Sequence, residues 1–141
     1  FRNSLIYAHS VDVCFDTLSA GDYTLYGHDM PGDDNSVMIE RKKDCMELCG
    51  NLGTKWEQFK VELEALKAYK YKIILVGDNY SFDYLYQKNF TQLHPNFIIK
   101  QLTYIQVHYN INFLFLKNVS IMEDYVYKLF KTINDKTWME N

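Results

Sequence analysis

Apolar and polar residues alternate in the first third of the chain, and a period of two is typical of half-buried strands. The segment from Val11 to Leu18 alternates in this way, and a turn at residues 20–22 leads into a second short segment, Tyr23 to Tyr26. A loop rich in glycine and aspartate follows, and Val37 to Arg41 then has the composition of a third strand. The pattern predicts a meander of three strands.

After residue 44 apolar residues recur at intervals of three and four, which indicates amphipathic helices. These helices alternate with short, continuous apolar runs that are typical of fully buried strands. The predicted elements are a short helix over 46–52, a helix over 54–69 capped by Thr54, a strand over 73–76, a helix over 94–109, a strand over 113–116 and a last helix over 120–133 capped by Ser120. The whole pattern predicts an α/β fold with a central mixed sheet flanked by helices.

Length and composition favour one domain over residues 1–141, because 141 residues with 48% hydrophobic content suffice for a single core. No apolar run approaches the roughly 20 residues of a membrane span, so no membrane association is expected, and no signal segment follows Phe1. The three cysteines fit reduced thiols, with Cys45 and Cys49 as well as Met46 expected to fill the core. We expect a soluble, intracellular protein, and a net charge of -3 still permits a local basic patch.

A charged tetrad, Glu40-Arg41-Lys42-Lys43, ends the third predicted strand. On a strand Glu40 and Lys42 project from one face and Arg41 from the other. An acid and a lysine in this arrangement suit a metal-assisted phosphodiester site, which also needs a second carboxylate, and the meander makes Asp22 the natural candidate. Taken alone, the tetrad also fits a solvated strand end.

The segments around the tetrad resemble the XPF-type (ERCC-four-type) nuclease domain, a member of the restriction-endonuclease-like group with a PD and (D/E)xK signature. They are TLSAGDYTL, VMIERK and ELCGNLGTKWEQFKVELEALKAY, which reproduce the family order of Gly-Asp, a variable spacer and Glu-Arg-Lys. The resemblance extends from about residue 11 over most of the chain and is greatest to the small single-domain versions of bacteria and phages. It implies a restriction-endonuclease-like fold and a cytoplasmic enzyme of DNA repair or recombination.

The resemblance also implies roles for individual residues. Asp22 and Glu40 would bind Mg2+ or Mn2+, with the backbone carbonyl of Arg41 as a third ligand. Lys42 would position or activate the attacking water. The Arg41 side chain would engage phosphate or brace the acidic cluster, and Lys43 would help to balance charge and contact DNA.

Three positions depart from the family pattern. The aspartate expected three residues after Glu-Arg-Lys is Met46 here, and Asp44 or Glu47 are the candidate substitutes. Family arginines near the next helix are replaced, which leaves Lys55 and Lys60 as nearby DNA-binding candidates. The family also begins with a strand carrying Asp-x-Arg-Glu, which would precede Phe1.

These observations predict a Mg2+-dependent DNA endonuclease that cuts branched, flapped or nicked DNA. The alternative is a catalytically degenerate module of the same fold that binds DNA or a partner protein, and Met46 favours it. Aromatic residues between 125 and 130 also permit a homodimer through the C-terminal helices.

Overall fold

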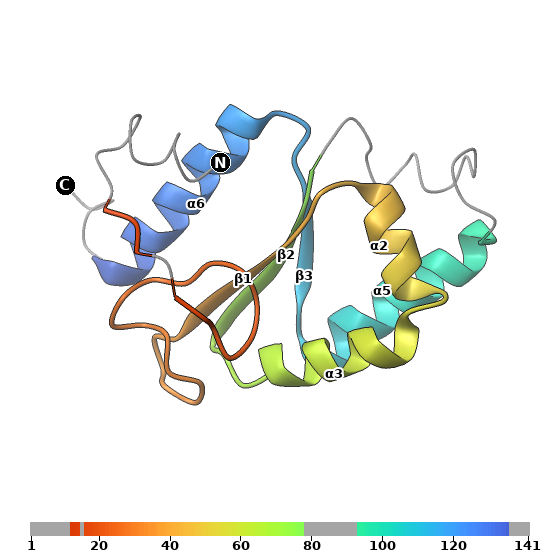
Figure 1. The fold of residues 1–141 in the computed structure, drawn as a ribbon, viewed down its shortest axis with the longest axis horizontal. Helices are drawn as coiled ribbons and strands as arrows, with labels where there is room; N and C mark the ends of the chain where they lie inside the picture. Colours follow the sequence, from red (N-terminus) through yellow and green to blue (C-terminus); the bar gives the residue numbers. More distant parts are fainter. Residues whose placement is uncertain (1–11, 15, 78–92, 136–141) are drawn as a thin grey trace.

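The computed structural model describes residues 12–14, 16–77 and 93–135. These residues form three strands and four helices in alternating order (Figure 1). The elements are β1 (Val37–Lys42), α2 (Cys45–Leu52), α3 (Trp56–Leu66), β2 (Tyr71–Val76), α5 (Pro95–Tyr109), β3 (Asn112–Phe115) and α6 (Val119–Asn134). The predicted α/β class, with a sheet flanked by helices, is confirmed.

The sheet has the strand order β1-β2-β3, and both pairs are parallel. Val37 pairs with Tyr71 at one end of the β1–β2 ladder, and Lys42 pairs with Val76 at the other. Parallel neighbours need a crossover connection, and α2 with α3 supplies the one between β1 and β2. Helices α2, α3 and α5 lie on one side of the sheet and α6 lies on the other (Figure 1). The charged C-terminal end of β1 therefore lies on an edge strand of the sheet, between the two layers of helices.

The predicted meander is reduced to one contact in the part of the chain that the structure describes. Tyr23 forms an isolated antiparallel bridge with Ile39, and residues 12–14 and 16–18 have no strand conformation. The alternation of apolar and polar residues over Val11 to Leu18 therefore predicted a regular strand that the described residues do not form. The segment 20–26 still follows the free edge of β1, which is the part of the meander that the site requires.

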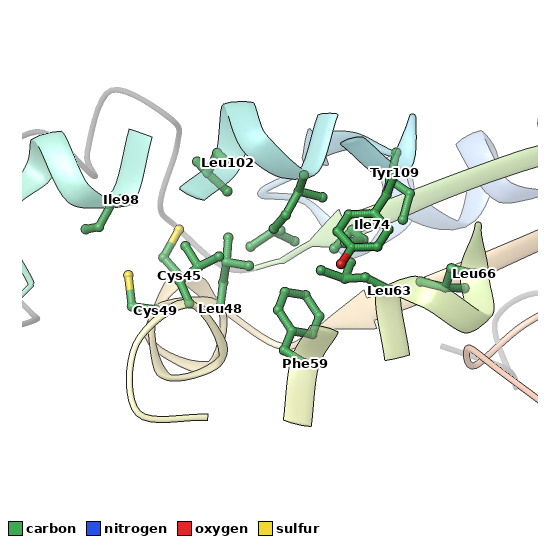
Figure 2. Packing of buried hydrophobic residues seen from close by; sticks show 14 of the residues in the cluster. Cys45, Leu48, Cys49, Phe59, Leu63, Leu66, Ile74, Ile98, Leu102 and Tyr109 are labelled. Carbon is green, nitrogen blue, oxygen red and sulfur yellow. The ribbon is translucent and has the colours of Figure 1, made fainter. Parts of the chain in front are cut away.

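Two apolar layers form on the two faces of the sheet, as the alternation of residues along β1 dictates. Met38 joins the larger layer with α2, α3 and α5, whereas Ile39 joins the smaller one with Met122 and Val126 of α6. Figure 2 shows side chains of the larger layer, drawn from α2, α3, β2 and α5: Cys45, Leu48, Cys49, Phe59, Leu63, Leu66, Ile74, Ile98, Leu102 and Tyr109. Glu40 and Lys42 continue the alternation of Met38, so they emerge beside α3.

Several local predictions were wrong, beginning with the residues that cap the helices. Helix α3 begins at Trp56 without a side-chain cap, and Asn118 rather than Ser120 caps α6 through its side-chain oxygen. Met46 is 57% exposed and does not fill the core, because it lies off the stripe of α2 that buries Cys45 and Cys49.

The aromatic residues predicted to pair two copies lie in α6, where Tyr125 and Phe130 pack partly against the sheet of their own chain. No helix among the described residues has the length and apolar character to cross a membrane.

Candidate active site at the C-terminal end of β1

Asp22 is held at the free edge of β1 by its own backbone and by its carboxylate. Its N–H donates to the carbonyl of Ile39 at 2.8 Å, and its Oδ2 accepts a hydrogen bond from the Arg41 N–H, also at 2.8 Å. The preceding Gly21 has φ +68°, and a Cβ there would collide with the side chain of Met38. A glycine is therefore required for the turn that delivers Asp22 to this edge.

Glu40 and Lys42 lie side by side on the face of β1 that α3 covers. The Lys42 Nζ is 3.2 Å from Glu40 Oε1 and lies 4.8 Å from the centroid of the Phe59 ring. Lys42 is only 4% exposed, which is rare for a lysine, and the side chain of Glu40 is 13% exposed. The adjacent acid compensates in part for the burial of this ammonium group, because it lies within ion-pair distance of it.

The pKa of the Glu40 carboxyl is raised from its ordinary 4.5 to about 7. Desolvation by burial is the largest cause, and the negative charge of Asp22 is the next. Lys42 opposes both, since its charge and its hydrogen bond lower the pKa of Glu40. The negative charge of Asp22 acts on Glu40 in the direction that a cation bound by both carboxylates would relieve.

The donor groups at this edge suit a hard divalent cation. Mg2+ prefers oxygen ligands and usually takes one or two carboxylates together with water, and Asp22 and Glu40 supply two. The N–H and C=O of one strand residue point to the same side. Since the Arg41 N–H binds Asp22, the Arg41 carbonyl faces the same edge. Among residues 12–14, 16–77 and 93–135, no group of three or more His, Cys, Asp or Glu side chains is arranged to hold a metal. A cation here would be held by the two carboxylates together with the backbone carbonyl and water.

Glu62 of α3 is a member of this cluster that the sequence did not indicate. Its Oε2 lies 3.9 Å from the Lys42 Nζ, and its charge also raises the pKa of Glu40. Its side chain is 42% exposed, so it reaches the ion pair from the solvent side. In the sequence Glu62 resembles the other surface acids of an amphipathic helix, and only the packing of α3 on β1 distinguishes it.

Arg41 and Lys43 point to the other side of the strand, as their odd positions require. Both line a cleft of about 1090 Å³ between the segment 12–29 and α6. Asp22 and Glu47 also line this cleft, and Lys131 of α6 faces it. The cleft therefore reaches the edge where Asp22 lies and carries three basic side chains along it.

The two candidate substitutes for the missing aspartate have other positions. The Oδ1 of Asp44 accepts from the Glu47 N–H at 2.8 Å and so caps the N-terminus of α2. Glu47 faces the cleft that Arg41 lines. The carboxylates whose charges raise the pKa of Glu40 are those of Asp22 and Glu62.

Lys55 and Lys60, the remaining basic candidates, lie away from Arg41 and Lys43. Lys55 precedes the first residue of α3, and Lys60 pairs with Glu57 at 3.0 Å. The Lys60 Nζ also lies 5.9 Å from the centroid of the Trp56 ring. The predicted DNA-binding residues thus fall into two groups on opposite sides of the sheet.

Comparisons with known proteins bear on the family and the fold of the chain. Residues 1–129 match the family model of the ERCC4 domain. The fold is similar to that of XPF from Aeropyrum pernix, with a TM-score of 0.68 and 16% identity over 96% of this chain. It is also similar to a structure of XPF from Aeropyrum pernix in complex with DNA, with a TM-score of 0.60 and 17% identity over 89% of the chain. The matches cover 60% and 56% of those two chains. No curated protein is significantly similar to the chain.

Proposed function

This chain belongs to the ERCC4 domain family, and on that premise we propose that it is a metal-dependent DNA endonuclease that cuts branched, flapped or nicked DNA. One observation carries the proposal: the buried Glu40–Lys42 pair lies beside Asp22 at an open strand edge. A structural ion pair would not need a third charge that raises the pKa of its own acid. A hydrolytic site does need two carboxylates and a fixed lysine at one place.

The bound Mg2+ or Mn2+ would supply Lewis-acid chemistry, polarising the scissile phosphate and lowering the pKa of the attacking water. Asp22 and Glu40 would hold the cation, together with the Arg41 carbonyl. Lys42 would orient the attacking water, because its ammonium group is fixed between Glu40 and Glu62. Water-excluding contacts with Phe59 limit the conformations that this lysine can adopt.

Basic side chains at the cleft would contact the DNA backbone and balance the charge that develops on the phosphate. Arg41 and Lys43 lie on the side of β1 that faces the cleft, next to Asp22. The similarity in fold to an XPF structure in complex with DNA supports this substrate. Each phosphate that these side chains neutralise releases counterions, so we expect binding to weaken as the salt concentration rises.

The test is cleavage of forked, flapped, nicked and plain duplex DNA in Mg2+ or Mn2+. Asp22→Ala and Lys42→Ala should each lower the rate by at least about 100-fold. Glu64→Ala is the matched control, because Glu64 is an exposed acid on α3 whose charge is not among those that shift Glu40. Full activity in both site variants would contradict the proposal.

A second candidate is a non-cleaving module of the same fold that binds DNA or a partner protein. It is favoured by the exposed Met46 at the position of the family aspartate. Metal titration separates the candidates, since a nuclease must bind Mn2+ at Asp22 and Glu40. Pairing of two copies through the C-terminal helices, and a role in DNA repair or recombination in a bacterium or phage, stay predictions.

A further inference from the structure

An aromatic stripe crosses the outer surface of α3 and α5, away from the cleft. We define it as Trp56 of α3 with Phe97, Tyr104 and His108 of α5. The three α5 residues lie on one side of the helix, because steps of seven and four residues return to nearly the same direction. Tyr104 is 42% exposed, Phe97 is 40% exposed and His108 is exposed. Exposed aromatic rings aligned in this way are unusual on a helix that already buries an apolar face.

Three rings of the stripe, those of Trp56, Tyr104 and His108, contact one another in a fixed order. Tyr104 stacks on His108 with centroids 5.0 Å apart and an interplanar angle of 14°. Trp56 meets Tyr104 edge to face at 6.0 Å. Tyr109, which is buried, supports the stripe from below through edge contacts with Tyr104 and His108. These contacts hold the rings in place before any ligand arrives, which lowers the entropic cost of binding.

Lysines flank the stripe. Lys100 precedes Tyr104 by one helical turn and is exposed. Lys60 lies over the Trp56 ring at 5.9 Å, and Lys67 lies over the Tyr109 ring at 6.0 Å. Lysine is depleted in the cores of protein–protein interfaces. Aromatic rings with lysines beside them are instead the composition of surfaces that stack nucleic-acid bases and neutralise phosphates.

The stripe is linked to the candidate active site through one buried ring, that of Phe59. Trp56 packs edge to face on Phe59 at 6.3 Å, and the Phe59 ring lies under the Lys42 ammonium group at 4.8 Å. One aromatic residue therefore separates the first ring of the stripe from the candidate catalytic lysine. Phe97 and His108 are eleven residues apart, or about 16 Å along the helix.

We propose that the aromatic stripe binds single-stranded DNA by base stacking. Bases in a duplex stack on each other and present only edges in the grooves, so the rings select an unpaired strand. The inference extends the proposed nuclease function by assigning the unpaired arm of a branched substrate to this surface. Binding is nevertheless measurable in the absence of cleavage, so the two claims can fail separately.

The experiment measures binding of a fluorescein-labelled (dT)10 strand and of a blunt 10-base-pair duplex by anisotropy in EDTA. Tyr104→Leu removes the ring but keeps apolar volume at the contact with α3, which protects the fold. Gln106→Ala is the matched control, because Gln106 is exposed on the same helix and lies about 200° around it from Tyr104. A Trp138→Phe background leaves Trp56 as the one indole, since the sequence has two tryptophans.

The single strand should bind more tightly than the duplex and should quench Trp56 fluorescence. Tyr104→Leu should weaken its binding about 5- to 20-fold, the loss of roughly one stacking contact, while Gln106→Ala has no effect. Equal affinity of Tyr104→Leu and the parent, or binding without quenching of Trp56, would overturn the inference. So would a parent dimer in sedimentation that Tyr104→Leu dissociates, because the stripe would then be a protein interface. Metal-dependent cleavage of a nicked duplex without binding of the single strand would overturn the inference about the stripe and leave the nuclease proposal intact.

Discussion

The two halves of β1 carry out different tasks in one strand. Val37, Met38 and Ile39 are almost completely buried and pack into the two apolar layers. Glu40 and Lys42 follow in the same alternation, yet they carry charges into a nearly buried position. The apolar half stabilises the fold, whereas the charged half retains ionisable groups whose burial is unfavourable in isolation. Such a local cost at the end of a well-packed strand is typical of a functional site.

The largest expected effect comes from the charged half. Glu40→Gln preserves the shape of the side chain but removes the negative charge that would hold the cation. We expect cleavage to fall about 1000-fold, which is about 4 kcal/mol of transition-state stabilisation. Single-turnover kinetics with saturating Mg2+ measures this loss. A decrease of less than tenfold would show that Glu40 is not a metal ligand.

The apolar half should respond in the opposite way. Ile39 is fully buried between the sheet and α6, so Ile39→Ala should lower the free energy of unfolding by about 3 kcal/mol. Urea denaturation measures it. The rate of cleavage per folded molecule should change little, because the Ile39 backbone, rather than its side chain, contacts Asp22. Loss of cleavage without loss of stability would show that the apolar half also serves the site, and would contradict the division of β1 into two halves.

The dependence of folding stability on pH tests the charged half of β1 without any substrate. The pKa of Glu40 is about 7 in the folded chain against an ordinary 4.5, so the folded state binds the proton more tightly than the unfolded state does. The wild-type chain should therefore lose stability relative to Glu40→Gln as the pH rises from 4.5 through 7. Between pH 4.5 and pH 8 in EDTA, the stability of the wild-type chain relative to Glu40→Gln should fall by about 1 to 3 kcal/mol. Parallel denaturation curves at pH 4.5 and pH 8, with a constant difference, would contradict the assignment.

The smallest expected effect concerns Glu62. Glu62→Gln removes the second acid beside Lys42, at 3.9 Å, and leaves the closer contact with Glu40 intact. We expect kcat to fall about 3- to 10-fold with little change in metal affinity, consistent with an exposed charge pair worth about 1 kcal/mol. Glu64→Gln on the same helix should have no effect. A large loss of Mn2+ affinity in Glu62→Gln would make Glu62 a ligand instead of a residue that positions Lys42.

Local patterns predicted most of the regular structure. The apolar run of 73–76 and the helical spacing after Pro95 lie in β2 and α5, because strand and helix periods depend only on nearby residues. Pro95 occupies the first turn of α5, with His94 as the cap. The alternation near the N-terminus failed because a period of two does not ensure a partner strand, and only Tyr23 finds one on β1 in the described residues.

The candidate site was predicted only in part, for the same reason. The resemblance selected Asp22, Glu40 and Lys42, and the structure brings these three together. Glu62 contacts Lys42 from a helix position twenty residues further along the chain, and no local pattern could distinguish it from Glu64. The cap role of Asp44 could have been predicted from the sequence, because an aspartate three residues before a glutamate, here Glu47, is a capping pattern at a helix start.

The most direct test of the charged half of β1 is Mn2+ binding followed by the EPR signal of the free ion. The wild-type chain should bind Mn2+ without DNA, and Asp22→Ala and Glu40→Gln should each weaken this binding at least about tenfold. Glu47→Gln, which alters an acid of the cleft, should bind as the wild type does. Binding that survives in both Asp22→Ala and Glu40→Gln, or that is absent from the wild type, would show that these two carboxylates do not form a metal site.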